Sequence, residues 1–175
     1  GAGAMADLLI GAANPSGKLA ESYPITYQDT PNHAYFPGHQ RTAEYREGLY
    51  IGYRYYDTAN IPVRYPFGHG LSYTTFLYSD IHAEKDRVTF TIANVGAWDG
   101  AEVAQVYVSC KDGNVFRPQK ELKGFAKVFL KAGESRTVSV SLDDKAFRYF
   151  NVKTNRWEVE SGIYTISIAS DSAHV

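Results

Sequence analysis

Apolar and polar side chains alternate along the second half of the chain, from about Thr75 onward. In the segment RVTFTIANVG, Val88, Phe90 and Ile92 share one face, and the positions between them are polar or small. The segments EVAQVYVSC, RTVSVSL and IYTISIA repeat this pattern. Their predicted inward faces are Ala104, Val106, Val108 and Cys110, then Val138, Val140 and Leu142, then Tyr164, Ile166 and Ile168. A period of two is typical of a strand that is buried on one face, so this half is predicted to consist of strands.

Short turns that contain glycine separate the alternating segments, at 94–96, 111–114, 131–134 and 160–162. Roughly seven strands over about 100 residues favour a two-sheet β-sandwich. The only cysteine is Cys110, so the cysteine pair that joins the sheets of an antibody domain is excluded. We therefore predict a mainly β fold: a fibronectin type III-like (immunoglobulin-like) β-sandwich. It would carry an N-terminal extension with a short helix and a long irregular connector.

The first 74 residues lack this alternation. Ala4–Ile10 are predicted to be the last turns of a helix that ends at Gly11. Prolines at 24, 31, 37, 62 and 66 then interrupt any long element. A chain that opens inside a helix is expected to be a fragment of a longer protein. Its location in the cell therefore cannot be inferred from a leader, and we lean only toward the cytoplasm.

One stretch, from Tyr45 to Phe76, is crowded with tyrosine and arginine. Both side chains combine a large flat surface with a polar end, so they suit contacts that are buried but not wholly apolar. A domain junction, a sugar-binding subsite and a nucleic-acid surface would all use such residues. The formal net charge of −1 and the pI near 6.6 argue against a nucleic-acid reader. A domain junction is the favoured interpretation, with a sugar subsite second.

Composition narrows the remaining classes of function. Hydrophobic residues make up 44% of the chain, enough for a globular core. No apolar run approaches the roughly 18 residues that span a bilayer, so no membrane contact is expected. The histidines other than His69 are His33, His39, His82 and His174, and they lack the spacing of metal ligands. No metal and no cofactor is predicted.

Four blocks of the sequence occur in a recognisable order: NPSGKLAESYP, YREGLYIGYRYYD, YPFGHGLSYTTF and RPQKELKGFAKVFLKAGES. They resemble successive blocks of glycoside hydrolase family 3 β-glucosidases, and the resemblance covers essentially the whole chain. It implies the C-terminal region of such an enzyme. Residues 1–25 would be the end of an α/β sandwich domain, 26–74 a connector, and 75–175 the fibronectin type III-like β-sandwich.

The resemblance also implies what this chain does not contribute. Family 3 enzymes retain configuration, with an aspartate nucleophile in a barrel domain and a glutamate acid/base in the α/β domain of three-domain members. Retention needs two carboxyl groups about 5–5.5 Å apart. Neither family motif is present, so no catalytic residue is predicted here. Glu44, Glu47 and Asp57 lie among arginines, which should lower their pKa values and suit structural ion pairs.

The sequence FGHG, residues 67–70, invites comparison with a phosphate-binding loop. Such a loop needs a helix after it, whereas LSYTTF reads as a strand. We expect Gly68 and Gly70 to allow positive φ at a tight turn, with His69 as a hydrogen-bonded structural residue.

Eight residues are predicted to be interdomain or structural contacts. They are Tyr53, Arg54, Tyr55, Asp57, His69, Arg117, Lys120 and Lys123. The implied partners are the barrel and α/β domains of the same protein, with a β-glycoside as substrate of the full enzyme. The segment Leu8–Ile10 has no predicted partner within the chain, so a homodimer of the fragment is also expected.

Two functions remain open. The region could be a non-catalytic part of a retaining β-glycosidase that stabilises the catalytic domains and shapes the rim of the cleft. Alternatively, it could be a free-standing carbohydrate-binding or adhesion module, because β-sandwiches often have that role.

Overall fold

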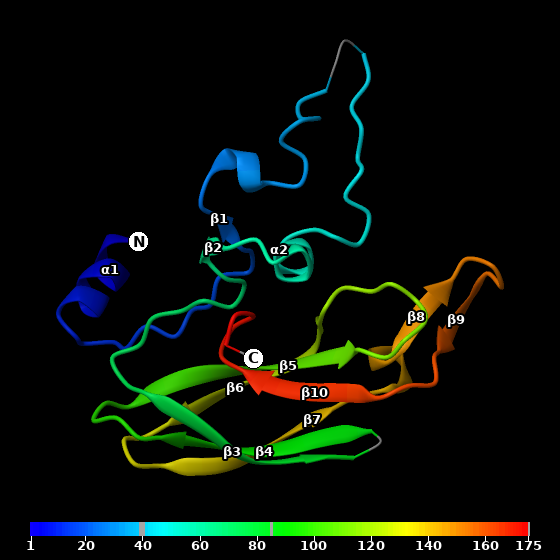
Figure 1. Ribbon diagram of the computed structural model, residues 1–175. Coiled ribbons are helices and arrows are strands. Elements are labelled where there is room, and N and C mark those ends of the chain that lie inside the picture. The colour runs from blue at the N-terminus through cyan, green and yellow to red at the C-terminus, as the bar shows by residue number, and fades with distance from the viewer. Residues whose placement is uncertain (39–40, 85, 175) are drawn as a thin grey trace.

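The computed structural model describes residues 1–38, 41–84 and 86–174, so His39 lies outside the described part. Six strands form two three-stranded antiparallel sheets, ordered β10-β5-β6 and β3-β4-β7 (Figure 1). The strands are β3 (Phe76–Ala83), β4 (Arg87–Asn94), β5 (Gly100–Cys110), β6 (Glu121–Leu130), β7 (Ser135–Ser141) and β10 (Tyr164–Ala169). A separate hairpin consists of β8 (Arg148–Asn151) and β9 (Arg156–Val159). A short 3₁₀ turn, Asp144–Ala146, precedes it. The predicted β-sandwich is confirmed.

The core lies between the two sheets. Val88, Phe90 and Ile92 on β4 are fully buried, and Val138 and Val140 on β7 are buried beside them. The threonines and serine between them, Thr89, Thr91 and Ser139, are exposed or half-buried. The predicted inward faces of these two strands are therefore confirmed. The sheet pairing follows from the alternation because a register slip of one residue would turn each apolar set outward.

Strand β5 differs from the half-buried strand that its alternation predicts. Ala104 and Val106 face the core, but Gln105 and Tyr107 on the opposite face are only 3% and 1% exposed. Both faces are buried because the first half of the chain crosses the outer face of this strand (Figure 1). From sequence, the polar and aromatic residues of that face were predicted to contact solvent. In the structure they contact another part of the same chain.

The N-terminal helix is present. α1 spans Ala2–Leu9, Ile10 is its C-cap, and Gly11 follows with φ +75°. Figure 1 shows α1 standing away from the sandwich, and none of its residues is buried. The predicted short helix is confirmed. Leu9 and Ile10 are exposed, whereas Leu8 is half-buried and its carbonyl accepts from the Tyr73 hydroxyl over 2.6 Å, so this segment does have one contact within the chain.

The connector is more regular than its prolines suggested. It contains α2 (Tyr53–Ala59), a 3₁₀ turn (Tyr27–Asp29) and the strand β2 (Val63–Tyr65), which pairs with β1 (Tyr23–Pro24) just before the connector. α2 begins after Gly52 and ends at Asn60, which has the left-handed conformation that often closes a helix. The strand expected directly after FGHG begins only at Phe76.

Candidate functional site

The two halves of the chain meet on the outer face of β5. Tyr107 lies there, and Tyr53 of α2 packs against it edge-on with ring centroids 5.9 Å apart. Phe67 packs against Tyr53 at a centroid distance of 4.9 Å. With Leu122 and Ala169, these rings form an apolar cluster separate from the sandwich core. We call this contact the junction.

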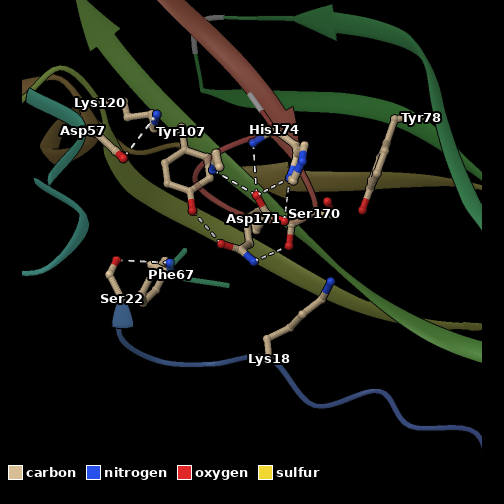
Figure 2. Close-up of polar contacts among 12 residues, drawn as sticks. Lys18, Ser22, Asp57, Phe67, Tyr78, Tyr107, Lys120, Ser170, Asp171 and His174 are labelled. Carbon is tan, nitrogen blue, oxygen red and sulfur yellow. Dashed lines mark hydrogen bonds and ion pairs between the residues drawn. The ribbon is translucent and has the colours of Figure 1, made fainter. Parts of the chain in front are cut away.

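Hydrogen bonds continue the junction through buried polar groups. The Tyr107 hydroxyl donates to Gln105 Oε1 over 2.6 Å, and Gln105 Nε2 donates to the carbonyl of Ser170 over 2.7 Å. The backbone N–H of Ser172 donates to the carbonyl of Phe67 over 2.8 Å. Figure 2 shows these groups converging from the turn, the strand and the C-terminal residues. Burial raises the pKa of Tyr107, so its hydroxyl stays a donor.

Charged residues link α2 to the start of β6. Lys120 Nζ lies 3.2 Å from Asp57 Oδ2, and both side chains are largely buried (Figure 2). Arg54 pairs with Glu121 at 3.6 Å, and Lys123 pairs with the same carboxylate at 3.2 Å. Two pairs therefore cross from α2 to the segment that begins β6, Asp57 with Lys120 and Arg54 with Glu121, while Lys123 supports Glu121 from the same strand.

The pKa of Asp57 departs from expectation. Its partner is a lysine and not one of the neighbouring arginines. Desolvation raises the pKa of Asp57 more than Lys120 lowers it. The prediction that arginines hold this pKa low is therefore wrong. A carboxylate with a raised pKa can be a catalytic acid, but Asp57 points from α2 against Lys120 and lines neither of the two cavities described below.

Backbone groups complete the attachment of β6. The N–H of Leu122 donates to the Tyr53 hydroxyl over 2.8 Å, and the N–H of Gln119 donates to Thr58 Oγ1 over 2.9 Å. The start of β6 is therefore attached to α2 of the same chain. Phe125, further along β6, is exposed.

A tight turn carries Phe67 onto β5. Gly68 has φ +84°, as predicted, and a Cβ there would lie 2.2 Å from Gln105 Nε2. Gly70 does not have positive φ, and that prediction is wrong. A side chain is disfavoured at Gly70 for a steric reason, because a Cβ there would lie 2.5 Å from the carbonyl oxygen of Gly17.

An apolar groove of about 790 Å³ opens between α1 and this turn. It is lined by residues that include Leu8, Leu19, Tyr65, His69 and Leu71. The His69 ring packs on the Tyr65 ring at 5.0 Å. Within the described part of the chain the imidazole makes no hydrogen bond, so the hydrogen-bonded histidine expected here is not observed.

A second cavity, of about 350 Å³, is polar. Its wall includes Lys18, Tyr78, Glu102 and Asp171. Lys18 Nζ lies 2.9 Å from Glu102 Oε1, and the Tyr78 hydroxyl donates to the same oxygen over 2.9 Å. This buried ion pair joins the segment after α1 to both sheets. Burial, with Glu102 nearby, raises the pKa of Tyr78.

Arg117 lies away from the junction, at the base of the β8–β9 hairpin. Its guanidinium pairs with Glu160 at 3.0 Å, lies 5.0 Å from the Tyr149 ring centre and donates to the Tyr164 hydroxyl over 3.4 Å. Burial lowers the pKa of Arg117, but these partners outweigh it and raise the pKa overall. Cys110 lies nearby. It was expected to face the core, but it is only half-buried.

The remaining predicted residue, Tyr55, packs its ring edge-on to Tyr56 at 5.3 Å. Sequence reasoning missed Lys18, Gln105, Tyr107 and Glu102. The alternation in β5 predicted that Gln105 and Tyr107 face solvent. The Tyr/Arg-rich stretch, which supplies Tyr53 to cover Tyr107, was the signal that could have corrected this prediction. Nothing in the local pattern marked Lys18 as an ion-pair partner of Glu102.

The site can do little chemistry of its own. Across residues 1–38, 41–84 and 86–174, no group of three or more histidine, cysteine or carboxylate side chains is arranged to hold a metal ion. Within those same ranges no helix is both long and apolar enough to cross a bilayer. The junction is a packing and hydrogen-bonding surface with carboxylates that are paired with cations.

Comparisons with known proteins identify the two halves separately. The family description "Glycosyl hydrolase family 3 C-terminal domain" matches residues 1–73, and "Fibronectin type III-like domain" matches residues 102–172. The thermostable beta-glucosidase B of Acetivibrio thermocellus is 48% identical over 99% of this chain and 24% of its own length. The exo-alpha-(1->6)-L-arabinopyranosidase of Bifidobacterium breve is 45% identical over 100% of this chain and 24% of its own.

A solved structure agrees. The crystal structure of a Bifidobacterium adolescentis GH3 beta-glucosidase superposes with a TM-score of 0.93 at 44% identity, covering 98% of this chain and 26% of that one. The chain therefore spans about a quarter of the length of the relatives it matches. The two family descriptions match in order, and the relatives match along almost the whole chain. The chain therefore belongs to glycoside hydrolase family 3, as its C-terminal domain region joined to a fibronectin type III-like domain.

Proposed function

We propose that this chain is the non-catalytic C-terminal region of a retaining β-glycosidase of the β-glucosidase type, which hydrolyses O-glycosidic bonds. Its role is to stabilise the catalytic domains and to shape the rim of their cleft. One observation carries the proposal: relatives named as beta-glucosidases match this chain from end to end while extending about four times as far.

The carboxylates of this chain support a non-catalytic role. Retaining hydrolysis needs a nucleophile and an acid/base about 5–5.5 Å apart across the scissile bond. Asp57 pairs with Lys120, and Glu102 pairs with Lys18. Asp171 accepts the N–H groups of Ala173 and His174. These buried acids hold the fold together, so the catalytic pair is assigned to the part of the enzyme outside this chain.

The division of labour within the chain follows the same proposal. Residues 1–25 complete an α/β sandwich domain, 26–74 form the connector, and 75–175 form the β-sandwich. Arg54, Asp57, Lys120 and Lys123 act as structural contacts that hold the connector on the sandwich. The barrel and α/β domains are its partners, and the substrate is a β-glycoside bound by those domains.

Two measurements on the purified chain test this function. The chain alone should show no turnover of an aryl β-glucoside, and turnover that vanishes in Asp57→Asn would contradict the proposal. Isothermal titration with cello-oligosaccharides addresses the alternative of a free-standing carbohydrate-binding module. Saturable binding by the chain alone would favour that module, and absence of heat supports the proposed role.

A further inference from the structure

The Tyr/Arg-rich stretch divides into an inward and an outward half. Tyr53 and Tyr56 are buried in the junction. Just before them, Leu49 and Ile51 are 63% and 55% exposed. The residues predicted as interdomain contacts are therefore largely occupied within the chain, and the outward half is the part that remains available to another body.

A second segment extends the outward half. Phe116, in the loop between β5 and β6, is 78% exposed and stacks on Tyr50 with ring centroids 5.4 Å apart. Figure 1 shows the segment that leads into α2 descending toward this loop. Leu49, Tyr50 and Ile51 are consecutive in the chain, and Phe116 stacks on Tyr50, so these four residues lie close together; we call them the ridge.

The ridge is held in place from below. The N–H of Asn114 donates to Glu160, and Arg117 pairs with the same carboxylate at 3.0 Å. The N–H of Gln119 donates to Thr58 Oγ1 over 2.9 Å. Phe116 is therefore exposed between two anchored positions. Anchors that are ordered before binding lower the entropic cost of an interface, and aromatic anchors dominate interface energies.

We propose that the ridge is the docking surface for the part of a family 3 polypeptide that lies outside this chain. The inference rests on the proposed function and names the surface through which that function acts. The relatives devote about three quarters of their length to residues beyond the match, so a large body is present in the same molecule. Tethering raises its effective concentration to the order of millimolar, which favours it over a second copy.

The chemistry of the ridge favours a protein as its occupant. Sugars need hydrogen-bonding groups around an aromatic face, whereas the residues on either side of Tyr50 in the chain, Leu49 and Ile51, are apolar. Tyr50 and Phe116 also cover one face of each other, at an interplanar angle of 28°. Exposed aromatic and aliphatic residues gathered together are typical of the centre of a protein interface.

The test uses a chimaera in which this chain replaces the matching quarter of beta-glucosidase B from Acetivibrio thermocellus. Ile51→Ser and Phe116→Ser should each shorten the half-life of activity on heating by roughly tenfold, as loss of an interface anchor does. Leu77→Ser is the control, because Leu77 on β3 is similarly exposed, at 56%. It should leave the half-life unchanged. In the chain alone, none of the three should lower the melting temperature appreciably.

Hydrogen exchange supplies the second readout. Residues 45–51 and 112–118 should exchange more slowly in the chimaera than in the chain alone. Equal exchange, or ridge variants that match Leu77→Ser, would overturn the inference while leaving the proposed function intact. Protection that appears only in the chain alone at high concentration would assign the ridge to a second copy and also overturn it. An inactive wild-type chimaera would count against the proposed function, and the same exchange comparison would then be made with the rest of the relative added in trans.

Discussion

At the scale of single residues, the backbone of Gly68 determines how the connector contacts β5. Its φ of +84° strains any residue with a side chain, and a Cβ there would lie 2.2 Å from the Gln105 amide, which hydrogen bonds to Tyr107 and Ser170 hold in place. Gly133 has a similar φ of +76° with nothing near its Cβ position. Substituting Gly133 therefore tests backbone strain alone, whereas substituting Gly68 tests strain together with a steric clash.

Gly68→Ala should be much more destabilising than Gly133→Ala. We expect about 1 kcal/mol for Gly133→Ala, the cost of a left-handed alanine, and about 3 kcal/mol for Gly68→Ala, where the clash adds to it. Urea unfolding of both variants measures the difference. Equal losses would show that the turn can move away from Gln105.

The ion pair of Asp57 and Lys120 gives a pH-dependent prediction. The folded state binds the proton of Asp57 more tightly than the unfolded chain does, because desolvation raises the pKa. The contribution of Asp57 to the free energy of unfolding is therefore largest at low pH. It falls as the pH rises from the ordinary aspartate pKa through the raised pKa of the folded state. Lys120→Met removes the opposing cation and should raise this pKa further.

Lys120→Met should therefore lose about 1–2 kcal/mol at neutral pH, allowing for partial exposure of the pair. The loss should shrink as the pH is lowered through the pKa of Asp57. Melting temperatures of wild type, Lys120→Met and the double variant with Asp57→Asn measure this between pH 4 and pH 8. A loss that is independent of pH would mean that Lys120 acts through packing alone.

Some of these residues could be predicted from sequence and others could not. Val88, Phe90 and Ile92 were assigned to the core because alternation depends only on neighbouring residues. Lys18 and Glu102 are 84 positions apart, and their pairing depends on how the first segment crosses the sandwich. Gln105 was misplaced for the same reason: its burial comes from a segment that local pattern does not locate.

At the scale of elements, α2 was missed because its apolar face consists of tyrosines. Tyr53 and Tyr56 are three positions apart and both buried, but tyrosine fits a surface pattern equally well. Flanking prolines at 62 and 66 also suggested an irregular chain. A helix of this length is stabilised by tertiary packing and not by propensity, so sequence alone carried little signal for it.

The β8–β9 hairpin should depend on Arg117. Two strands alone are marginally stable, and Arg117 ties this hairpin to the loop before β6 through Glu160. Arg117→Met should accelerate hydrogen exchange across 148–159 by about tenfold, because that opening then requires less free energy. Arg136→Met, which breaks the exposed pair with Glu134 at 2.7 Å, should have almost no effect. Unchanged exchange in Arg117→Met would show that the aromatic contacts are sufficient.

Glu160 makes the stability of the β8–β9 hairpin depend on pH in the acid range. The N–H of Asn114 and the guanidinium of Arg117 outweigh desolvation and lower the pKa of Glu160. A lowered pKa stabilises the fold above the ordinary glutamate range, and this stability is lost as pH falls through the folded value. The hairpin is therefore expected to loosen in acid before the sandwich core does.

At the scale of the whole molecule, the fold class was predictable and the arrangement of the first half was not. Alternation and turns define a sandwich without reference to distant residues. The position of residues 1–74 depends on long-range contacts at the junction, with Tyr53, Phe67 and Tyr107 at its centre. Family resemblance supplied the order of domains, but the ridge became visible only once buried and exposed residues were separated.

Self-association is expected for the chain alone. Leu9 and Ile10 of the α1 end are 83% and 77% exposed. Apolar side chains on a helix with no buried face favour contact with a second copy. Light scattering at tens of micromolar should report a dimer, and Leu9→Ser with Ile10→Ser should convert it to a monomer. A wild-type monomer would rule out this contact.

The central claim is that this chain acts as the C-terminal region of a β-glucosidase without contributing catalytic groups. The most direct measurement is the aryl β-glucosidase activity of the chimaera, compared with beta-glucosidase B and with the same enzyme lacking its matching quarter. We expect the chimaera to retain activity within about tenfold of the parent, because the two chains are 48% identical over 99% of this one. We expect the shortened enzyme to lose activity or heat resistance. A shortened enzyme as active and heat-resistant as the parent, or a well-folded chimaera without activity, would contradict it.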